Sequence, residues 1–168
     1  MAANNILIVD DEVEITKSIA RQFRRKYNVL IATSGEEAFP ILEKNEVQIV
    51  ISDQRMPGIT GVDFFTQIKE KYPNTIRIIL TGYSDIDAVV GAINNGHIFR
   101  YMRKPWNPVE LNSIVEEAFE KHELVRTNKL LLSTLKSTNE MLEEKVKERT
   151  LALEEANKIL TNINDEKN

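Results

Sequence analysis

Three acidic side chains stand where apolar runs of the sequence end. Residues 49–53 (IVISD) form a short β-branched run that ends on Asp53, and a Met-Pro-Gly turn follows shortly after it. Residues 5–10 (NILIVD) form a similar run that ends on Asp10, with Asp11 directly behind it. Such runs are typical of strands that are buried on both faces of a parallel sheet. Because open α/β sheets bind ligands beyond the carboxyl ends of their strands, we expect the three carboxylates to share one crevice.

Two further strand ends carry a hydroxyl group and an amine. Thr81 ends the run 76–81 (IRIILT), and Lys104 follows the run 98–102. Carboxylates crowded into one crevice repel one another, and a hard divalent cation such as Mg²⁺, or alternatively Mn²⁺, relieves that repulsion. A carboxylate can also attack phosphorus, while a hydroxyl and an ammonium group stabilise the phosphoryl oxygens. These residues therefore predict metal-assisted phosphoryl chemistry on Asp53.

The residues around these groups alternate between strand and helix patterns over about 120 residues. We expect strands at residues 5–10, 28–32, 47–53, 76–81 and 98–102, and helices at 14–26, from Ser34 onward, at 61–71, around 88–93 and from about 107. Ser34 is a good N-cap, and Pro40 fits its helix only near the first turn. The alternation predicts an α/β fold of the doubly wound class, with a parallel sheet covered by helices on both faces.

The composition is that of a soluble globular protein. The chain has 168 residues, of which 42% are apolar and 29% charged, and its formal net charge is −4. No apolar run approaches the ~20 residues that span a bilayer, and no secretory leader is present, so we expect a cytoplasmic protein without a membrane partner. The absence of cysteine excludes disulfides and thiol chemistry. The acidic balance argues against a nucleic-acid partner.

The sequence after Pro108 differs from the body, because it contains neither glycine nor further proline and fits one heptad register. Most core positions of that register are apolar, among them Leu132, Leu135, Leu142 and Val146, whereas Asn139 is polar. This pattern predicts a long helix in a parallel, dimeric coiled coil, in which a core asparagine favours two strands. Two alternatives stay open. In the first, the helix is solitary and its ends are frayed. In the second, part of the helix packs against its own domain or within a larger bundle, through an apolar stripe that Leu124, Leu131 and Ile159 widen.

The motifs together resemble the receiver domain of two-component response regulators. The resemblance is carried by Asp10-Asp11, by Asp53 within DQRMPGITG, by Thr81-Gly82 and by Lys104-Pro105, and it covers residues 4 to about 120. It implies a flavodoxin-like sheet of five parallel strands in the order 2-1-3-4-5. It also implies a cis peptide bond between Lys104 and Pro105.

The resemblance also implies a role for each residue of the site. Asp53 is the expected phosphoacceptor, and Lys104 is expected to contact the phosphoryl group. The expected Mg²⁺ ligands are Asp11, Asp53 and the backbone carbonyl of Arg55, with Asp10 acting largely through water. Thr81 and Tyr101 are the expected switch pair.

Two bulky residues lie two positions beyond the phosphoacceptor and the switch threonine. These are Arg55 and Tyr83, and our hypothesis is that they impede attacking water and so lengthen the life of the phosphoryl group.

The predicted function is that of a response regulator, not an enzyme beyond its own phosphorylation and dephosphorylation. It would accept a phosphoryl group from a sensor histidine kinase. The predicted division is a receiver at 1–120 and a dimerising helix at 108–168. Residues 86–106 resemble receivers linked to HD-GYP phosphodiesterase, diguanylate cyclase, kinase or phosphatase modules, and residues 142–150 resemble signalling helices. No output motif follows, so we expect a chain cut before its output domain.

Two other functions compete with this prediction. One is a passive dimerising scaffold whose receiver is not phosphorylated. The other is a haloacid-dehalogenase-type phosphatase, which also uses an aspartate after a strand. That class needs a second acid two residues later, where this chain has Arg55.

Overall fold

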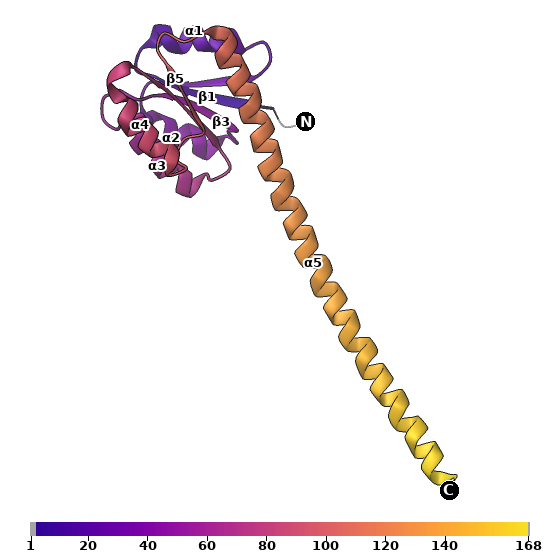
Figure 1. Cartoon of the computed structure of the whole chain (residues 1–168). Coiled ribbons are helices and arrows are strands. Elements are labelled where there is room, and N and C mark those ends of the chain that lie inside the picture. The colour runs from indigo at the N-terminus through magenta and orange to yellow at the C-terminus, as the bar shows by residue number, and fades with distance from the viewer. Residues whose placement is uncertain (1–2, 168) are drawn as a thin grey trace. The chain divides into compact units, whose positions relative to one another are not determined.

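A computed structural model describes residues 3–167, apart from the side chain of Tyr83. Five strands form one parallel sheet in the order β2-β1-β3-β4-β5 (Figure 1). The strands are β1 (Asn5–Val9), β2 (Asn28–Ala32), β3 (Ile49–Asp53), β4 (Ile76–Thr81) and β5 (Arg100–Arg103). The predicted flavodoxin-like sheet and its strand order are therefore confirmed.

Helices connect the strands and cover both faces of the sheet. They are α1 (Val13–Phe23), α2 (Gly35–Lys44), α3 (Gly61–Lys71), α4 (Ile86–Asn94), which follows the short 3-10 turn η1 (Tyr83–Asp85), and α5 (Pro108–Glu166). Alternate residues of each central strand enter two separate core clusters, as a pleated strand requires. In β1, Leu7 and Val9 pack with α2, α3 and α4, whereas Ile6 and Ile8 pack with α1 and the start of α5. Strands β3 and β4 are buried throughout, which places their carboxyl ends at a sheltered edge.

The start of α2 and the end of α4 have the residues that suit those positions. The Ser34 hydroxyl accepts a hydrogen bond from the Glu37 backbone N–H at 3.1 Å and begins α2 as expected. Gly96, after α4, has the left-handed φ of 73° that suits a helix end. Pro40 differs from the expectation, because it lies well inside α2 rather than near its first turn. The helix continues past it with one donor missing, since proline has no N–H for the carbonyl of Glu36.

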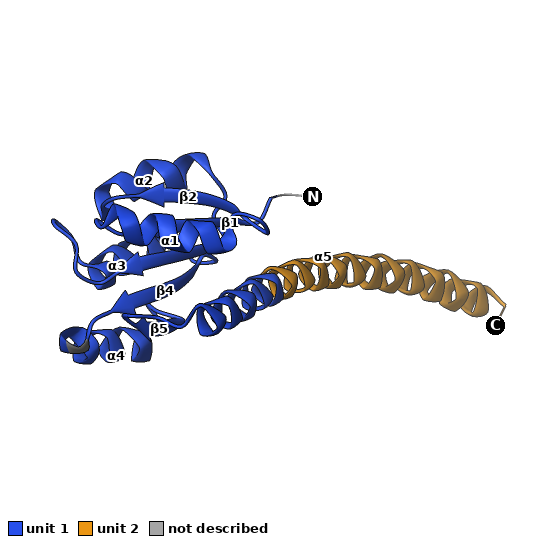
Figure 2. Cartoon of the chain, turned by 90° about the horizontal axis from the view of Figure 1, so that it is seen from above, with its two compact units in different colours: residues 1–125 blue, residues 126–168 orange. Residues whose placement is uncertain are grey.

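The chain divides into two compact units, residues 1–125 and 126–168 (Figure 2). Helix α5 begins in the first unit, where Leu111, Ile114, Val115 and Ala118 are buried in the core. Every described residue of the second unit, from 126 to 167, is exposed. Across residues 3–167, no helix is both long and apolar enough to span a membrane.

Candidate functional site

Asp10, Asp11 and Asp53 meet at the carboxyl edge of the sheet. Strands β1 and β3 are hydrogen-bonded neighbours with Val9 opposite Ser52, so the residues that follow them emerge side by side. One carboxylate oxygen from each acid lies within 4.8 Å of the others. Asp10 and Asp53 are buried, whereas Asp11 is exposed. This all-oxygen donor set suits a hard divalent cation such as Mg²⁺.

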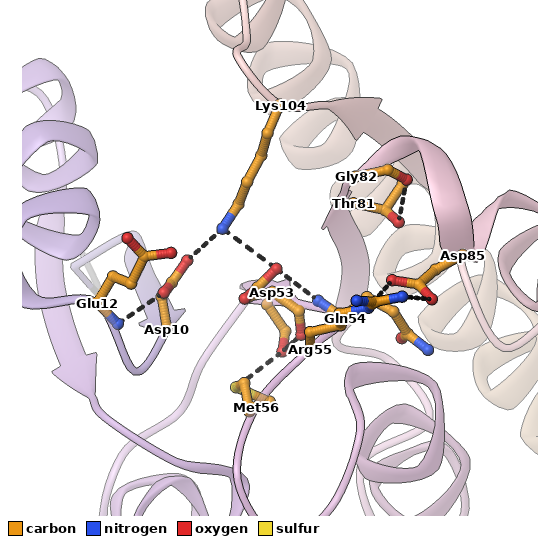
Figure 3. Close-up of polar contacts among 11 residues, drawn as sticks. Asp10, Glu12, Asp53, Gln54, Arg55, Met56, Thr81, Gly82, Asp85 and Lys104 are labelled. Carbon is orange, nitrogen blue, oxygen red and sulfur yellow. Dashed lines mark hydrogen bonds and ion pairs between the residues drawn. The ribbon is translucent and has the colours of Figure 1, made fainter.

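Lys104 joins two of these acids across the pocket (Figure 3). Its ammonium Nζ lies 3.0 Å from Asp10 Oδ2 and 3.2 Å from Asp53 Oδ1. The backbone holds it there, because the Lys104 N–H donates to the Thr81 carbonyl at 2.9 Å. The expected cis bond between Lys104 and Pro105 is confirmed. Sequence spacing predicted this convergence of groups from β1, β3 and β5.

Burial and charge change the acidity of the pocket in ways that oppose each other. Burial raises the pKa of Asp53 above its ordinary value of 3.8; the positive charge of Lys104 lowers that pKa, and the negative charge of Asp10 raises it. For Lys104, burial alone lowers the pKa, but hydrogen bonds and charge attraction from Asp10 and Asp53 outweigh burial and raise it. The lysine is therefore cationic at neutral pH, and it faces an acid that is costly to ionise.

The backbone around Asp53 is held by contacts that the spacing of the strands does not predict. The Gln54 N–H donates to Asp53 Oδ1 at 2.8 Å, and the buried Gln54 side chain accepts from the Val62 N–H at 2.9 Å. Gly61 begins α3 against the Asp53 carbonyl, so closely that a Cβ there would overlap it. These contacts depend on the path of the loop between β3 and α3, which spacing alone does not define.

The two expected switch residues lie on neighbouring strands but are not opposite each other. Thr81 is fully buried, and its hydroxyl donates to the Gly82 carbonyl at 3.1 Å. Tyr101 is half-buried, packs against the core on the α3–α4 side, and pairs with Ile79. Their roles as a switch pair stay predictions.

Arg55 lies at the mouth of the pocket, with 71% of its side chain exposed. It forms an ion pair with Asp85, at 2.7 Å between Nε and Oδ2. The side chain of Tyr83, the other predicted lifetime residue, lies outside the described part of the structure. Arg55 and Asp85 both line a pocket of about 250 Å³. It is lined by Asp11, Glu12, Asp53, Arg55, Gly82, Ser84, Asp85 and Lys104.

Comparison with known proteins gives one consistent family. The family model described as the response regulator receiver domain matches residues 6–116. The hydrogenase transcriptional regulatory protein HoxA of Cupriavidus necator is 36% identical over 115 residues, which cover 68% of this chain and 24% of that protein. The chain thus spans about a quarter of the length of this curated relative and of others that it matches.

Two solved structures extend the likeness to three dimensions. The adenylate cyclase from Rhodopirellula baltica superposes with a TM-score of 0.76 at 26% identity, over 78% of this chain and 98% of that chain. The signal receiver domain of an HD domain-containing protein from Pseudomonas fluorescens Pf-5 has a TM-score of 0.71 at 32% identity, over 75% and 93% of the two chains.

Proposed function

Because this chain belongs to the family of response regulator receiver domains, we propose that it is a phosphorylation-dependent switch. Asp53 accepts a phosphoryl group from a sensor histidine kinase, and α5 passes the change to an output module. The observation that carries the proposal is the position of Lys104 Nζ, 3.0 Å from Asp10 and 3.2 Å from Asp53. A buried carboxylate beside a fixed cation offers a nucleophile and a partner for phosphoryl oxygens in the same pocket.

The proposed transfer forms one bond and breaks one. An oxygen of Asp53 attacks phosphorus, and the P–N bond of the donor phosphohistidine breaks as the P–O bond forms. The imidazole leaves and takes up a proton. The Lys104 ammonium group neutralises charge on the phosphoryl oxygens, and the Thr81 hydroxyl donates to one of them.

The oxygen donors at the pocket fit Mg²⁺ or Mn²⁺, and we assign the ion to Asp11, Asp53 and the backbone carbonyl of Arg55, with Asp10 acting through water. When bound, the ion would offset the repulsion among the acids and the incoming phosphoryl group. These side chains are already gathered within reach of one another.

We assign transmission of the signal to Thr81, Tyr101 and α5. In this proposal Thr81 moves toward the phosphoryl group and Tyr101 turns further inward, which changes the surface where α5 begins. In this proposal the receiver occupies residues 1–120 and the dimerising helix occupies residues 108–168. The two ranges overlap because the first turns of α5 belong to both. Support for a dimer comes from the exposed apolar seam of the helix, which has Leu132 at 68% and Leu142 at 54% exposure in the single chain.

The test is labelling with acetyl phosphate in the presence of Mg²⁺, followed by intact-mass measurement. We expect one phosphoryl group per chain, lost in Asp53→Asn and lost when EDTA removes the metal. Asp87→Asn is the matched control, because Asp87 is an exposed acid in the first turn of α4. Absence of labelling would favour a passive scaffold, and sustained release of phosphate from an aryl phosphate would favour a phosphatase.

A further inference from the structure

One guanidinium group joins two loops at the mouth of the acidic pocket (Figure 3). Arg55, in the loop after β3, donates from Nε to Asp85 Oδ2 at 2.7 Å and from Nη2 to Asp85 Oδ1 at 3.2 Å. Its Nη2 also donates to the Ser84 hydroxyl at 2.8 Å. We call this set of Arg55, Ser84 and Asp85 the clasp. The clasp connects the loop that carries Asp53 to the residues directly before α4.

In the clasp, Asp85 does not act as the helix cap that its position in the sequence suggests. Asp85 occupies the N-cap position of α4, where an aspartate ordinarily accepts a hydrogen bond from a backbone N–H of the first turn. Its side chain makes no such capping bond. The carboxylate instead accepts two hydrogen bonds from Arg55. The Asp85 side chain at the start of α4 is therefore held by Arg55 rather than by a capping bond.

Phosphorylation would place a stronger partner for Arg55 in the same pocket. Arg55, Asp85 and Asp53 all line the cavity of about 250 Å³. A phosphoryl group has close to two negative charges and three strong acceptor oxygens, and guanidinium groups bind such oxygens in pairs. An ion pair whose arginine is 71% exposed is weak and easily exchanged.

We propose that Asp85 is a positioning residue that holds Arg55 beside the start of α4 until Asp53 is phosphorylated, whereupon Arg55 leaves Asp85 for the phosphoryl oxygens. The inference rests on the proposed phosphorylation of Asp53. The move of Arg55 then has two effects. On the phosphoryl oxygens, Arg55 shields the phosphoryl group from water. Its departure from Asp85 frees η1 and the first turn of α4.

The other end of α4 is held independently of the clasp. Buried Arg77 of β4 donates from Nε to the His97 carbonyl at 2.7 Å and from Nη2 to the Gly96 carbonyl at 3.4 Å. These bonds fasten the turn after α4 to the sheet. Release of the clasp would therefore loosen the start of α4 while its end stays in place.

The first test measures the half-life of phosphorylated Asp53 in Asp85→Asn. Loss of the competing carboxylate leaves more of Arg55 on the phosphoryl group, so we expect the half-life to lengthen by about two- to fivefold, the range that one exposed ion pair allows. In an Arg55→Ala background the same substitution should have no effect. Glu43→Gln is the matched control, because it removes an exposed ion pair to Lys71 of the same 2.7 Å length and should leave the half-life unchanged.

The second test follows backbone hydrogen exchange at residues 84–88. We expect beryllofluoride to speed exchange there in the wild-type chain, and Asp85→Asn to show faster exchange without it. Exchange at residues 95–97 should stay constant in both proteins. If beryllofluoride left exchange at residues 84–88 unchanged, Arg55 would have stayed on Asp85, and that result would overturn the proposal.

The outcomes separate this inference from the function on which it rests. If the wild-type chain takes up no phosphoryl group on Asp53, the proposed function fails and the inference with it. If the chain is labelled but Asp85→Asn leaves the half-life of phosphorylated Asp53 unchanged or shorter, only the role of Asp85 is refuted. The same holds if Asp85→Asn lengthens the half-life equally in the Arg55→Ala background. A cooperative thermal transition and full initial labelling of each variant establish that the variants are folded.

Discussion

The carboxylate of Asp53 opposes folding when it is ionised. It is only 6% exposed, and burial together with Asp10 raises its pKa, although Lys104 partly offsets both effects. Replacing it with asparagine removes one negative charge from the cluster and leaves Lys104 paired with Asp10. We therefore expect Asp53→Asn to raise the free energy of unfolding by about 1 kcal/mol in metal-free buffer at pH 7, measured by urea denaturation.

The same substitution has a defined pH dependence. An acid whose pKa is higher in the folded chain than in the unfolded chain costs stability above the folded value and nothing below the unfolded one. The advantage of Asp53→Asn should therefore be full at neutral pH, should shrink as the pH falls through the raised pKa, and should disappear below 3.8. An advantage that stayed undiminished at pH 3.8 would contradict this account. Added Mg²⁺ should narrow the gap at neutral pH, because it binds the wild-type site more tightly.

The charged residues of the pocket can be predicted from the sequence, but the groups that hold them cannot. Asp10, Asp53 and Lys104 each follow a parallel strand, so the topology alone brings them together. The partnership of Arg55 with Asp85 could not be predicted in that way. It joins two loops 30 residues apart, and the conformation of a loop depends on contacts that strand order does not define.

At the scale of elements, the turn between α4 and β5 depends on one buried cation. Arg77 is 8% exposed, burial lowers its pKa, and among the residues that the structure describes no carboxylate forms an ion pair with it. Three backbone carbonyls accept from it instead: Thr75 at 2.8 Å, His97 at 2.7 Å and Gly96 at 3.4 Å. The negative end of the α4 dipole adds to this stabilisation.

We expect Arg77→Met to lower the free energy of unfolding by about 2–3 kcal/mol, because it leaves the buried Thr75 carbonyl and the partly buried contacts at His97 and Gly96 without this donor. Urea denaturation measures the loss. Arg100→Met is the matched control on the neighbouring strand, where the exposed side chain lies 3.6 Å from Glu117. That change should stay within about 1 kcal/mol. Equal losses in the two variants would refute the role given to Arg77.

The elements differ in how well their boundaries could be predicted. The boundaries of β3 are easy to predict, because its apolar run is buried on both faces and ends on an acid. Those of β5 are harder to predict, since the strand begins at Arg100 rather than at the expected Ile98 and contains exposed arginines at an edge of the sheet. Helix α2 continues through Pro40 because Phe39, Ile41 and Leu42 pack against the core, which compensates for one missing hydrogen bond.

At the scale of the whole molecule, one heptad pattern runs through both the buried start of α5 and its exposed remainder. Leu111, Ile114 and Ala118 occupy core positions of the register, yet they are buried in the receiver and cannot face a partner helix. Any coiled coil must therefore begin beyond them. The heptad pattern does not reveal this division, because a stripe that faces a sheet and a stripe that faces a second helix have the same spacing.

The proposed dimer makes a prediction about two adjacent residues of α5. Leu142 lies on the core seam of the register and Met141 lies off it, yet their exposures in the single chain are similar, at 54% and 62%. If two copies pair along the seam, Leu142→Lys removes a buried leucine from each chain and forfeits roughly 2 kcal/mol or more. The dimer dissociation constant should then rise by at least about thirtyfold, as measured by sedimentation equilibrium. Met141→Lys should leave it within about threefold of the wild-type value, because an exposed position on the outer face tolerates charge. Dissociation that was equal in both variants, or a monomeric wild-type chain, would mean that α5 does not associate through this seam.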